Sequence, residues 1–442
     1  MSDFTYPAEL PITPLTAPPT ATVTVPGSKS ITNRALVLAA LSDSTNAGCT
    51  LTDVLRSEDT EVMADCLRRL GLEVIDIDPL TMTVRRGGSA DVITDDEWIP
   101  RGRADLFVGN SGTTVRFLTA MLALGEGTYR LDGIPRMRER PIQDLLDALR
   151  QLGVDARSEL GNGCPPVIVN ANGLRGGHVR IKADVSSQFL SGLMLVAPFA
   201  RGDTVLEIDG PLVSEPYVEM SIAMLQQFGL RITAEGRGLY LIPGGQRHGH
   251  RAYTIEPDAS SASYFLAAAA ITGGTIGVAG LTTKSIQGDV RFLDVLEEMG
   301  CTAYRGTDSI AITGGRLRGV DVDMNDISDT VMTLGAVACF AEGATTIRNV
   351  GHIRHKETDR IAALATELRK LGAEVEERGD GLTITPRPLT GCAVDTYNDH
   401  RMAMSLALVG LKVPGVVIRN PGCVAKTYPG FWQDLAKVGS GQ

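Results

Sequence analysis

One segment recurs five times along this chain, and it combines a leucine-rich helix pattern, a glycine and a strand-like stretch. The copies read LRRLGLEVI, LRQLGVDA, LQQFGLRIT, LEEMGCTA and LRKLGAEVE, and their glycines are Gly71, Gly153, Gly229, Gly300 and Gly372. A glycine directly after a helix is typical of a C-terminal cap. The glycines lie 71 to 82 residues apart. This period predicts a fold built from large repeated units.

A second element alternates with the first: a helix of small residues, a glycine turn and an alternating strand. Its copies span residues 33–41 with 49–55, 113–132, 187–209, 262–278, 330–350 and 401–419. Alternating helices and strands indicate an α/β fold. We therefore predict six units of about seventy residues. Accidental similarity within a generic α/β sheet is the alternative.

The chain length of 442 residues favours two or three domains, and six units divide into three and three. A Gly/His-rich stretch at 244–250 suits a crossover between domains, with the join near 253–259. The proline-rich N-terminal arm is expected to run along the second domain before crossing at Pro26-Gly27. The predicted domains are residues 27–256 and, discontinuously, residues 1–26 with 257–442.

Cysteine usage and hydropathy bear on the compartment. The seven cysteines are scattered, without a CxxC pair, which is typical of reduced thiols in a cytosolic protein. The first ten residues lack the basic and apolar regions of a signal peptide. Apolar stretches such as 265–270 are too short to cross a bilayer. We therefore expect a soluble cytoplasmic protein without a membrane partner.

Cations stand at the start of several apolar segments, although the formal net charge is −10. These cations are Lys29, Arg34, Arg116, Lys356, Arg360, Arg401 and Lys426. Helix N-termini already attract anions through unpaired N–H groups and a partial positive charge. Nucleic-acid binding would instead require a broad basic face. The pattern predicts a small polyanionic ligand and no nucleic acid.

Three motifs place polar groups before such helices. PGSKSITNR (26–34) is not a Walker A loop, because threonine and serine stand where its first glycine and its lysine would fall. GNSGTTVR (109–116) has a glycine-rich turn that allows a ligand to approach the backbone. Ser186-Ser187-Gln188 supplies neutral donors. A capped helix with a solvated lysine is the alternative for the first motif.

The densest charged motif is HKETDR at 355–360. Lys356 and Arg360 are four residues apart and are expected to share a helix face, with Glu357 beside them. A salt-bridged surface helix is the alternative. Asp329 takes the corresponding position in the fifth unit. His352 and His355 alone make a weak metal pattern, so no metal is expected.

Seven motifs, in order from Pro26 to Phe431, resemble the 5-enolpyruvylshikimate-3-phosphate synthase family. They are PGSKSITNR, GNSGTTVRFL, PRMRERPI, SSQFLSGL, HKETDR, NDHRMAM and AKTYPGF. The resemblance implies an α/β fold of two domains, each of three βαβαββ units in an inside-out, barrel-like arrangement, joined by a two-stranded hinge. It implies transfer of the enolpyruvyl group of phosphoenolpyruvate to the 5-hydroxyl of shikimate 3-phosphate, with release of phosphate and without a cofactor. It also implies a site in the interdomain cleft; a monomer is expected.

The resemblance also assigns roles to individual residues. Ser30 and Arg34 resemble the ligands of the shikimate carboxylate, and Tyr217 the residue that packs on its ring. The residues that resemble its 3-phosphate ligands are Ser186, Ser187, Ser214 and Lys356. Those that resemble ligands of the phosphoenolpyruvate phosphate are Lys29, Arg136, Gln188 and Lys426, with Asn110 and Gly112 beside them. Arg360 and Arg401 resemble the carboxylate ligands of phosphoenolpyruvate, and Asp329 and Glu357 the proton-transfer carboxylates. Lys29 is also expected to be a catalytic residue.

Two positions depart from the family pattern: His352 replaces a common asparagine, and Phe117 a common proline. The imidazole of His352 is still expected to bind substrate by donating a hydrogen bond to phosphate, in a role that varies with pH. The resemblance further implies inhibition by glyphosate, for which Gly112, lacking a Cβ, is expected to leave open space. UDP-N-acetylglucosamine enolpyruvyl transferase is one alternative, but its loop cysteine has no counterpart between residues 110 and 140. A non-catalytic anion-binding protein is the other, and it would not need Asp329 and Glu357.

Overall fold

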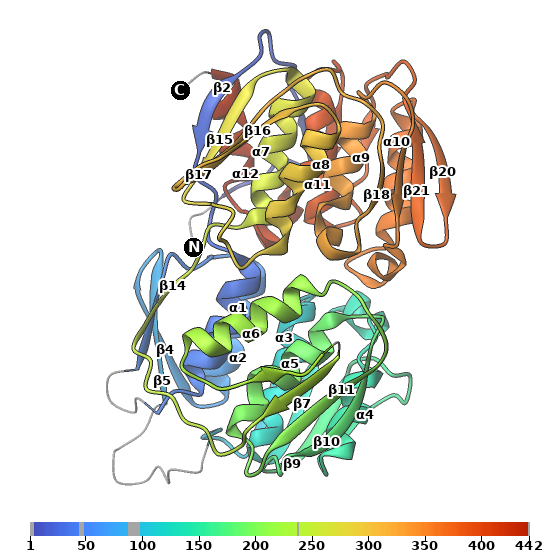
Figure 1. Cartoon of the computed structure of the whole chain (residues 1–442). Coiled ribbons are helices and arrows are strands. Elements are labelled where there is room, and N and C mark those ends of the chain that lie inside the picture. Colours follow the sequence, from blue (N-terminus) through green and yellow to red (C-terminus); the bar gives the residue numbers. More distant parts are fainter. Residues whose placement is uncertain (1–3, 44–47, 87–97, 237, 441–442) are drawn as a thin grey trace. The chain divides into compact units, whose positions relative to one another are not determined.

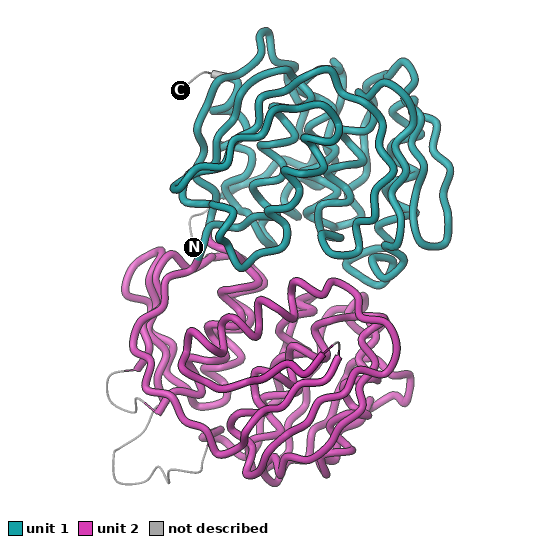
Figure 2. Tube along the Cα trace, viewed as in Figure 1, with its two compact units in different colours: residues 1–26, 256–442 teal, residues 27–255 magenta. Residues whose placement is uncertain are grey.

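The computed structural model describes residues 4–43, 48–86, 98–236 and 238–440. The chain forms two compact units, residues 1–26 with 256–442 (unit 1) and residues 27–255 (unit 2) (Figure 2). It therefore passes between the units twice, at residues 26–27 and 255–256.

Each unit contains three small sheets, and five of the six sheets share one pattern. A parallel pair of strands is followed by two antiparallel strands, as in the order β6-β7-β9-β8. The strands of unit 2 are β3 (Cys49–Thr52), β4 (Leu72–Asp78), β5 (Thr81–Arg86), β6 (Arg103–Phe107), β7 (Glu126–Asp132), β8 (Asp155–Ser158), β9 (Val167–Asn172), β10 (Gly177–Ala183), β11 (Thr204–Leu212), β12 (Thr233–Ala234), β13 (Leu239–Ile242) and β14 (Ala252–Thr254). Those of unit 1 are β1 (Glu9–Pro11), β2 (Thr20–Val23), β15 (Thr275–Ala279), β16 (Thr302–Arg305), β17 (Ser309–Thr313), β18 (Asp321–Asp323), β19 (Thr345–Arg348), β20 (Glu374–Arg378), β21 (Gly381–Thr385), β22 (Ala393–Val394) and β23 (Val417–Arg419).

Two of these sheets contain a strand that lies just before a point where the chain passes to the other unit. β2 precedes the first helix of unit 2 but pairs with β15 in unit 1. β14 precedes the first helix of unit 1 but pairs in parallel with β3 in unit 2. Each crossing segment thus completes the sheet of the unit that it leaves. Sequence periodicity counts the repeats, but it does not reveal this exchange.

Helices form two classes (Figure 1). The small-residue helices contact one another in the interior of each unit: α1 (Lys29–Ala40), α3 (Gly112–Met121) and α5 (Ser187–Val196) in unit 2, and α7 (Ala259–Thr272), α9 (Val331–Ala338) and α11 (His400–Gly410) in unit 1. The amphipathic ones are α2 (Glu58–Arg69), α4 (Gln143–Gln151), α6 (Pro216–Gln227), α8 (Phe292–Glu298), α10 (Arg360–Lys370) and α12 (Phe431–Ser440). Short 3-10 helices are η1 (Leu122–Leu124), η2 (Pro135–Glu139), η3 (Ala197–Phe199), η4 (Gly288–Arg291), η5 (Asn325–Thr330), η6 (Gly351–His355) and η7 (Pro421–Lys426).

The predicted repeat is confirmed for five units, each of which reads βαβαββ. The sixth unit is shorter and consists of β22, α11, β23 and α12. Among the residues that the structure describes, no further strand follows α12. The N-terminal strand β1 supplies its third strand by pairing antiparallel with β23.

The five repeat glycines lie where a C-terminal cap requires them. Their φ angles run from 79° to 107°, in the left-handed region that glycine adopts without a Cβ clash. After α4, the N–H of Gly153 donates to Arg150 and that of Val154 to Leu149, which is a Schellman motif. The predicted caps are therefore confirmed.

Two further observations concern the compartment. All seven cysteines are free thiols. None of the described helices is long and apolar enough to cross a membrane.

Candidate active site

In unit 2, the predicted site residues gather at the N-termini of the three interior helices. Lys29, Gly112 and Ser187 are the first residues of α1, α3 and α5. Side-chain contacts bring the three N-termini together: Lys29 and Thr114 both contact Asp59, and Gln188 contacts Thr113. Their N–H groups and partial positive charges favour an anion there.

Arg34 lies deep in unit 2, with 1% of its surface exposed. It donates from Nε to Ser221 Oγ (2.8 Å) and from Nη2 to the carbonyl of Tyr217 (2.9 Å). Phe117 lies in the middle of α3, and the Arg34 guanidinium stacks 5.1 Å from its ring centre. Burial lowers the pKa of Arg34 to about 10. Within the described part of the chain no carboxylate pairs with Arg34, so its charge favours an incoming anion.

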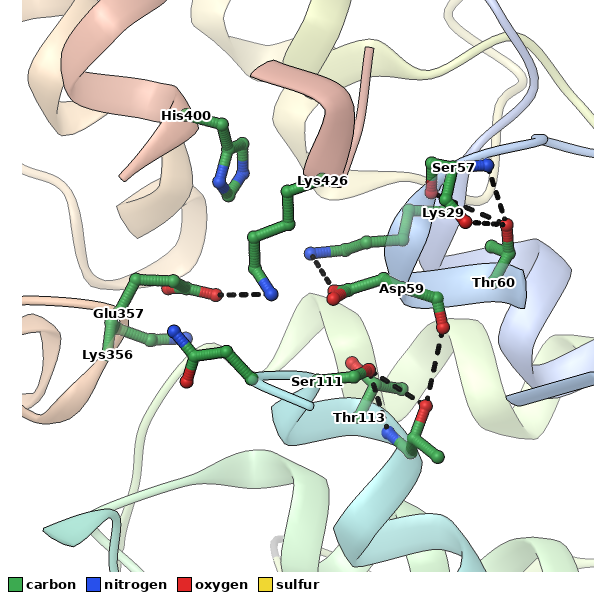
Figure 3. Close-up of polar contacts among 12 residues, drawn as sticks. Lys29, Ser57, Asp59, Thr60, Ser111, Thr113, Lys356, Glu357, His400 and Lys426 are labelled. Atoms are coloured by element: carbon green, nitrogen blue, oxygen red, sulfur yellow. Dashed lines mark hydrogen bonds and ion pairs between the residues drawn. The ribbon is translucent and has the colours of Figure 1, made fainter. Parts of the chain in front are cut away.

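Lys29 lies opposite a carboxylate that the sequence analysis overlooked. Its Nζ is 3.6 Å from Asp59 Oδ2 on α2, and Figure 3 shows the two side chains directed at each other. Asp59 lies in the first turn of α2, behind the capping box of Ser57 and Thr60. Ser57 followed by acidic residues in SEDTE is an N-cap signal that would have found the helix start, though not the ion pair. The carboxylate holds Lys29 at the head of α1 until an anion competes for it.

The heads of α3 and α5 are joined through Gln188. Its Oε1 accepts from Arg116 Nη1 (2.6 Å), and its Nε2 donates to Thr113 Oγ1 (3.1 Å). Ser186 caps α5 by accepting from the N–H of Gln188. The predicted residues Ser186, Ser187 and Gln188 are thus brought beside the Gly112 turn. Arg116 supports Gln188 rather than opening a helix.

The space beside Gly112 is occupied, so the expectation of open space is wrong. A Cβ built on Gly112 would lie 2.4 Å from Nη2 of Arg140, well inside van der Waals contact. Arg140 is buried, and its Nη1 donates to the carbonyl of Asn110 (2.8 Å). Arg140 directly follows the 3-10 helix η2, on which Arg136 pairs with Glu139 at 2.9 Å. Arg140 thereby ties the segment that carries Arg136 to the turn of Asn110 and Gly112.

Ser214 has a backbone conformation that is uncommon for serine, with φ of 52°. It follows β11 and precedes α6, on which Tyr217 lies. Asp53, Asn349 and Asn420 have positive φ after the corresponding strands of three other repeats. Non-glycine residues keep such angles where the surroundings enforce them, and such positions cluster at functional sites.

In unit 1, four predicted residues and Asp399 form one charged cluster around Arg360. Arg360 donates from Nε to Asp399 (2.8 Å), from Nη2 to Glu357 (2.8 Å) and from Nη1 to Asp329 (3.2 Å). Burial alone would lower the pKa of Arg360, but the three carboxylates raise it above its ordinary value. Arg401 Nη2 donates to Asp329 Oδ2 at 2.6 Å. Asp329 therefore accepts from two arginines.

Two lysines extend this cluster. Lys426 Nζ lies 3.9 Å from Glu357 Oε1, as Figure 3 shows, and Lys356 Nζ lies 4.0 Å from Asp329 Oδ1. The arrangement places the three carboxylates of Asp329, Glu357 and Asp399 among four cations. Such a site can bind a multiply charged anion and also holds groups able to accept a proton.

The predicted helix over HKETDR is wrong in its boundary. α10 begins at Arg360, because the Asp359 carboxylate caps it by accepting from the N–H of Ala362 (3.1 Å). Lys356 therefore lies outside the helix, and Asp329 rather than a shared helix face brings it near Arg360. α10 is also an amphipathic outer helix, so these cations do not stand before a small-residue helix as expected.

His352 is buried in η6, and its Nε2 lies 3.0 Å from Ser328 Oγ. Burial lowers the pKa of His352 to about 3, and the positive charge of the nearby Lys356 adds to this effect. The imidazole is therefore neutral at neutral pH and can exchange a hydrogen bond with Ser328 without changing charge. A role for His352 that varies with pH near neutrality is not supported.

Replacing His352 by asparagine should leave the pH profile of activity between about pH 6 and pH 9 unchanged in shape. The same change should flatten the pH dependence of stability. In the parent, the unfolded imidazole takes up a proton below its ordinary pKa of 6.5, whereas the folded one does so only near 3, so stability falls as pH falls through this window. Between pH 6.5 and about pH 4.5 the free energy of unfolding should fall by about 2 kcal/mol less in the variant than in the parent. Urea unfolding at several pH values measures this difference, and His178→Asn, at an exposed histidine, is the control. The same dependence of unfolding free energy on pH in His352→Asn and the parent would contradict the prediction.

Sequence reasoning missed Asp59, Arg140 and Asp399. Asp399 lies within the NDHRMAM motif, and its position before an apolar helix is an N-cap signal. The structure shows that it caps α11 by accepting from the N–H of Arg401 (2.9 Å). Asp59 and Arg140 act through contacts with residues 30 positions away, which no local pattern reveals.

A family model described as EPSP synthase (3-phosphoshikimate 1-carboxyvinyltransferase) matches residues 15–435. The chain belongs to the EPSP synthase family. The 3-phosphoshikimate 1-carboxyvinyltransferase of Nostoc sp. is 49% identical over 96% of this chain and 98% of its own length. That of Sulfurovum sp. is 46% identical over 95% of this chain and 96% of its own length.

The fold agrees with this membership. A solved EPSP synthase from Acinetobacter baumannii matches with a TM-score of 0.78 and 25% identity, over 97% of this chain and 98% of its own. The predicted two-domain inside-out α/β fold is therefore confirmed. UDP-N-acetylglucosamine enolpyruvyl transferase is not favoured.

Proposed function

We propose that the residues described above carry out the reaction of the family. Unit 2 holds shikimate 3-phosphate, and cationic residues of both units hold phosphoenolpyruvate. The chain is an enzyme that transfers the 1-carboxyvinyl group of phosphoenolpyruvate to shikimate 3-phosphate. Ser186, Ser187 and Ser214 offer hydroxyl groups to the 3-phosphate, and Arg34 and Ser30 meet the shikimate carboxylate. Tyr217 packs on the ring.

Phosphoenolpyruvate carries a phosphate and a carboxylate, and the site offers cations to both. Lys29, Arg136, Gln188 and Lys426 hold the phosphate. Arg360 and Arg401 hold the carboxylate, and they are pre-oriented by Asp329 and Asp399. Positioning charges before the reaction avoids reorganisation during it.

The observation that carries the proposal is the pairing of Asp329 and Glu357 through Arg360. Joining a hydroxyl oxygen to the alkene carbon requires the hydroxyl to lose a proton and the methylene carbon to gain one. Loss of phosphate then requires the new methyl group to give a proton back. Asp329 and Glu357 are the groups placed for these transfers.

Phosphate release tests this function. Purified protein with phosphoenolpyruvate and shikimate 3-phosphate should release inorganic phosphate, whereas either compound alone should not. Replacing shikimate 3-phosphate by UDP-N-acetylglucosamine should abolish the release. Binding of both compounds without phosphate release would favour the non-catalytic alternative.

We further propose that the cationic residues of both units act on one pair of substrates and draw the units together. Without anions, Lys29 and Arg136 of unit 2 and Lys356 and Lys426 of unit 1 would repel one another if brought close. Bound phosphates and carboxylates reverse this repulsion. Small-angle scattering should therefore show a smaller radius of gyration with shikimate 3-phosphate than without it. An unchanged radius would contradict closure but not catalysis.

A further inference from the structure

Glu367 is a completely buried carboxylate on α10, away from the charged cluster, and 0% of its side chain is exposed. Its Oε1 accepts from Tyr397 Oη (2.7 Å) and Lys370 Nζ (2.8 Å), and its Oε2 accepts from the backbone N–H of Asp395 (3.0 Å). Burying a carboxylate is costly unless several donors satisfy it. Two of the three donors belong to the loop between β22 and α11.

That loop is strained at two consecutive residues. Tyr397 and Asn398 both have φ of 54°, in the left-handed region. Asparagine tolerates this conformation, but an aromatic residue adopts it rarely, because its bulky side chain is strained there. Tyr397 is 41% exposed, so core packing does not enforce its conformation. A backbone hydrogen bond from the N–H of Asp399 to the carbonyl of Thr396 (2.8 Å) closes the turn. The side chains add the hydrogen bond from Tyr397 to Glu367 and the bond from Asn420 Nδ2 to Asn398 Oδ1 (3.2 Å).

Helix α10 fastens this loop at both ends. Arg360 and Glu367 are seven residues apart, which is close to two turns, so they share a face of α10. Arg360 binds Asp399 at the end of the loop, and Glu367 binds Asp395 and Tyr397 at its start. Asp399 then caps α11 at the N–H of Arg401. The strained turn therefore lies between two anchors on one rigid element.

We propose that Glu367 is a positioning residue: through Tyr397 it holds the strained turn that directs Asp399 toward Arg360 and Arg401 toward Asp329. This rests on the proposed role of Arg401 as a ligand of the phosphoenolpyruvate carboxylate. A purely structural Glu367 would affect folding but would not single out one substrate. Loss of the Tyr397 contact would let the turn relax and shift the N-terminus of α11. Arg401 would then bind that carboxylate less tightly.

Tyr397→Phe tests the proposal, because it removes one hydroxyl from a half-exposed side chain. The KM for phosphoenolpyruvate should rise about tenfold, as expected for a lost bond to a buried charge. The KM for shikimate 3-phosphate should stay within about twofold, because most of its proposed ligands lie in unit 2. Tyr304→Phe, at an exposed tyrosine of β16, is the matched control and should change neither value.

A second substitution tests the strain directly. Glycine adopts positive φ without penalty, so Tyr397→Gly removes the hydroxyl and the strain together, and its KM for phosphoenolpyruvate should stay well below that of Tyr397→Phe. Glu367→Gln keeps an oxygen acceptor and should cost less than Glu367→Ala. Unchanged KM values in Tyr397→Phe, an equal rise for both substrates, or a Tyr397→Gly variant as impaired as Tyr397→Phe would each overturn the proposal. Turnover of the parent enzyme tests the proposed function separately.

Discussion

Replacing Glu357 by glutamine is expected to lower kcat at least a hundredfold while changing both KM values less than about threefold. Glutamine matches glutamate in size, and its oxygen can still accept the bond that Arg360 Nη2 now donates at 2.8 Å. What it loses is the ability to take up a proton, and positioned acid–base groups contribute about 10²–10⁴ to rate. Steady-state kinetics with both substrates measures the split between turnover and binding.

Glu377→Gln is the matched control for this change. Glu377 also pairs with an arginine, Arg354, at 3.0 Å, but it lies on exposed strand β20. The control should retain parent kinetics. If Glu357→Gln raised KM as much as it lowered kcat, Glu357 would be a ligand-positioning group rather than a proton carrier.

Replacing Gly112 by alanine is expected to raise the KM for phosphoenolpyruvate roughly thirtyfold, which corresponds to about 2 kcal/mol of overpacking. The new methyl group would meet the Arg140 guanidinium at 2.4 Å and displace it from the Asn110 carbonyl. The turn that faces the phosphate would then lose its support. Gly112 does not have a positive φ, so backbone strain does not contribute.

A double-mutant cycle tests whether the new methyl group raises the KM through its contact with Arg140. Lysine at position 140 keeps the charge but lacks the planar guanidinium that fills the space beside Gly112. Gly112→Ala should therefore cost several-fold less in the Arg140→Lys background than in the parent. Equal costs in the two backgrounds would show that the methyl group acts on the ligand directly.

Much of the site could be predicted because its residues occupy short motifs at helix starts. Lys29, Gly112 and Ser187 begin helices where the pattern placed them. The prediction failed for Lys356, because Asp359 competes as a helix cap and starts α10 four residues later. It failed also for Gly112, because the side chain that fills the neighbouring space comes from residue 140.

The sequence by itself determined the number of repeats, their α/β character, the capping glycines and the residue types offered to the anions. These are local properties, since helix periodicity, glycine caps and N-terminal cations all act within a few residues. The tertiary structure decided the exchange of β2 and β14 between sheets, the pairing of Lys29 with Asp59 and the anchoring of the strained turn by Glu367. Each of these joins groups distant in sequence, and their contact depends on how sheets and helices pack, which no local pattern specifies.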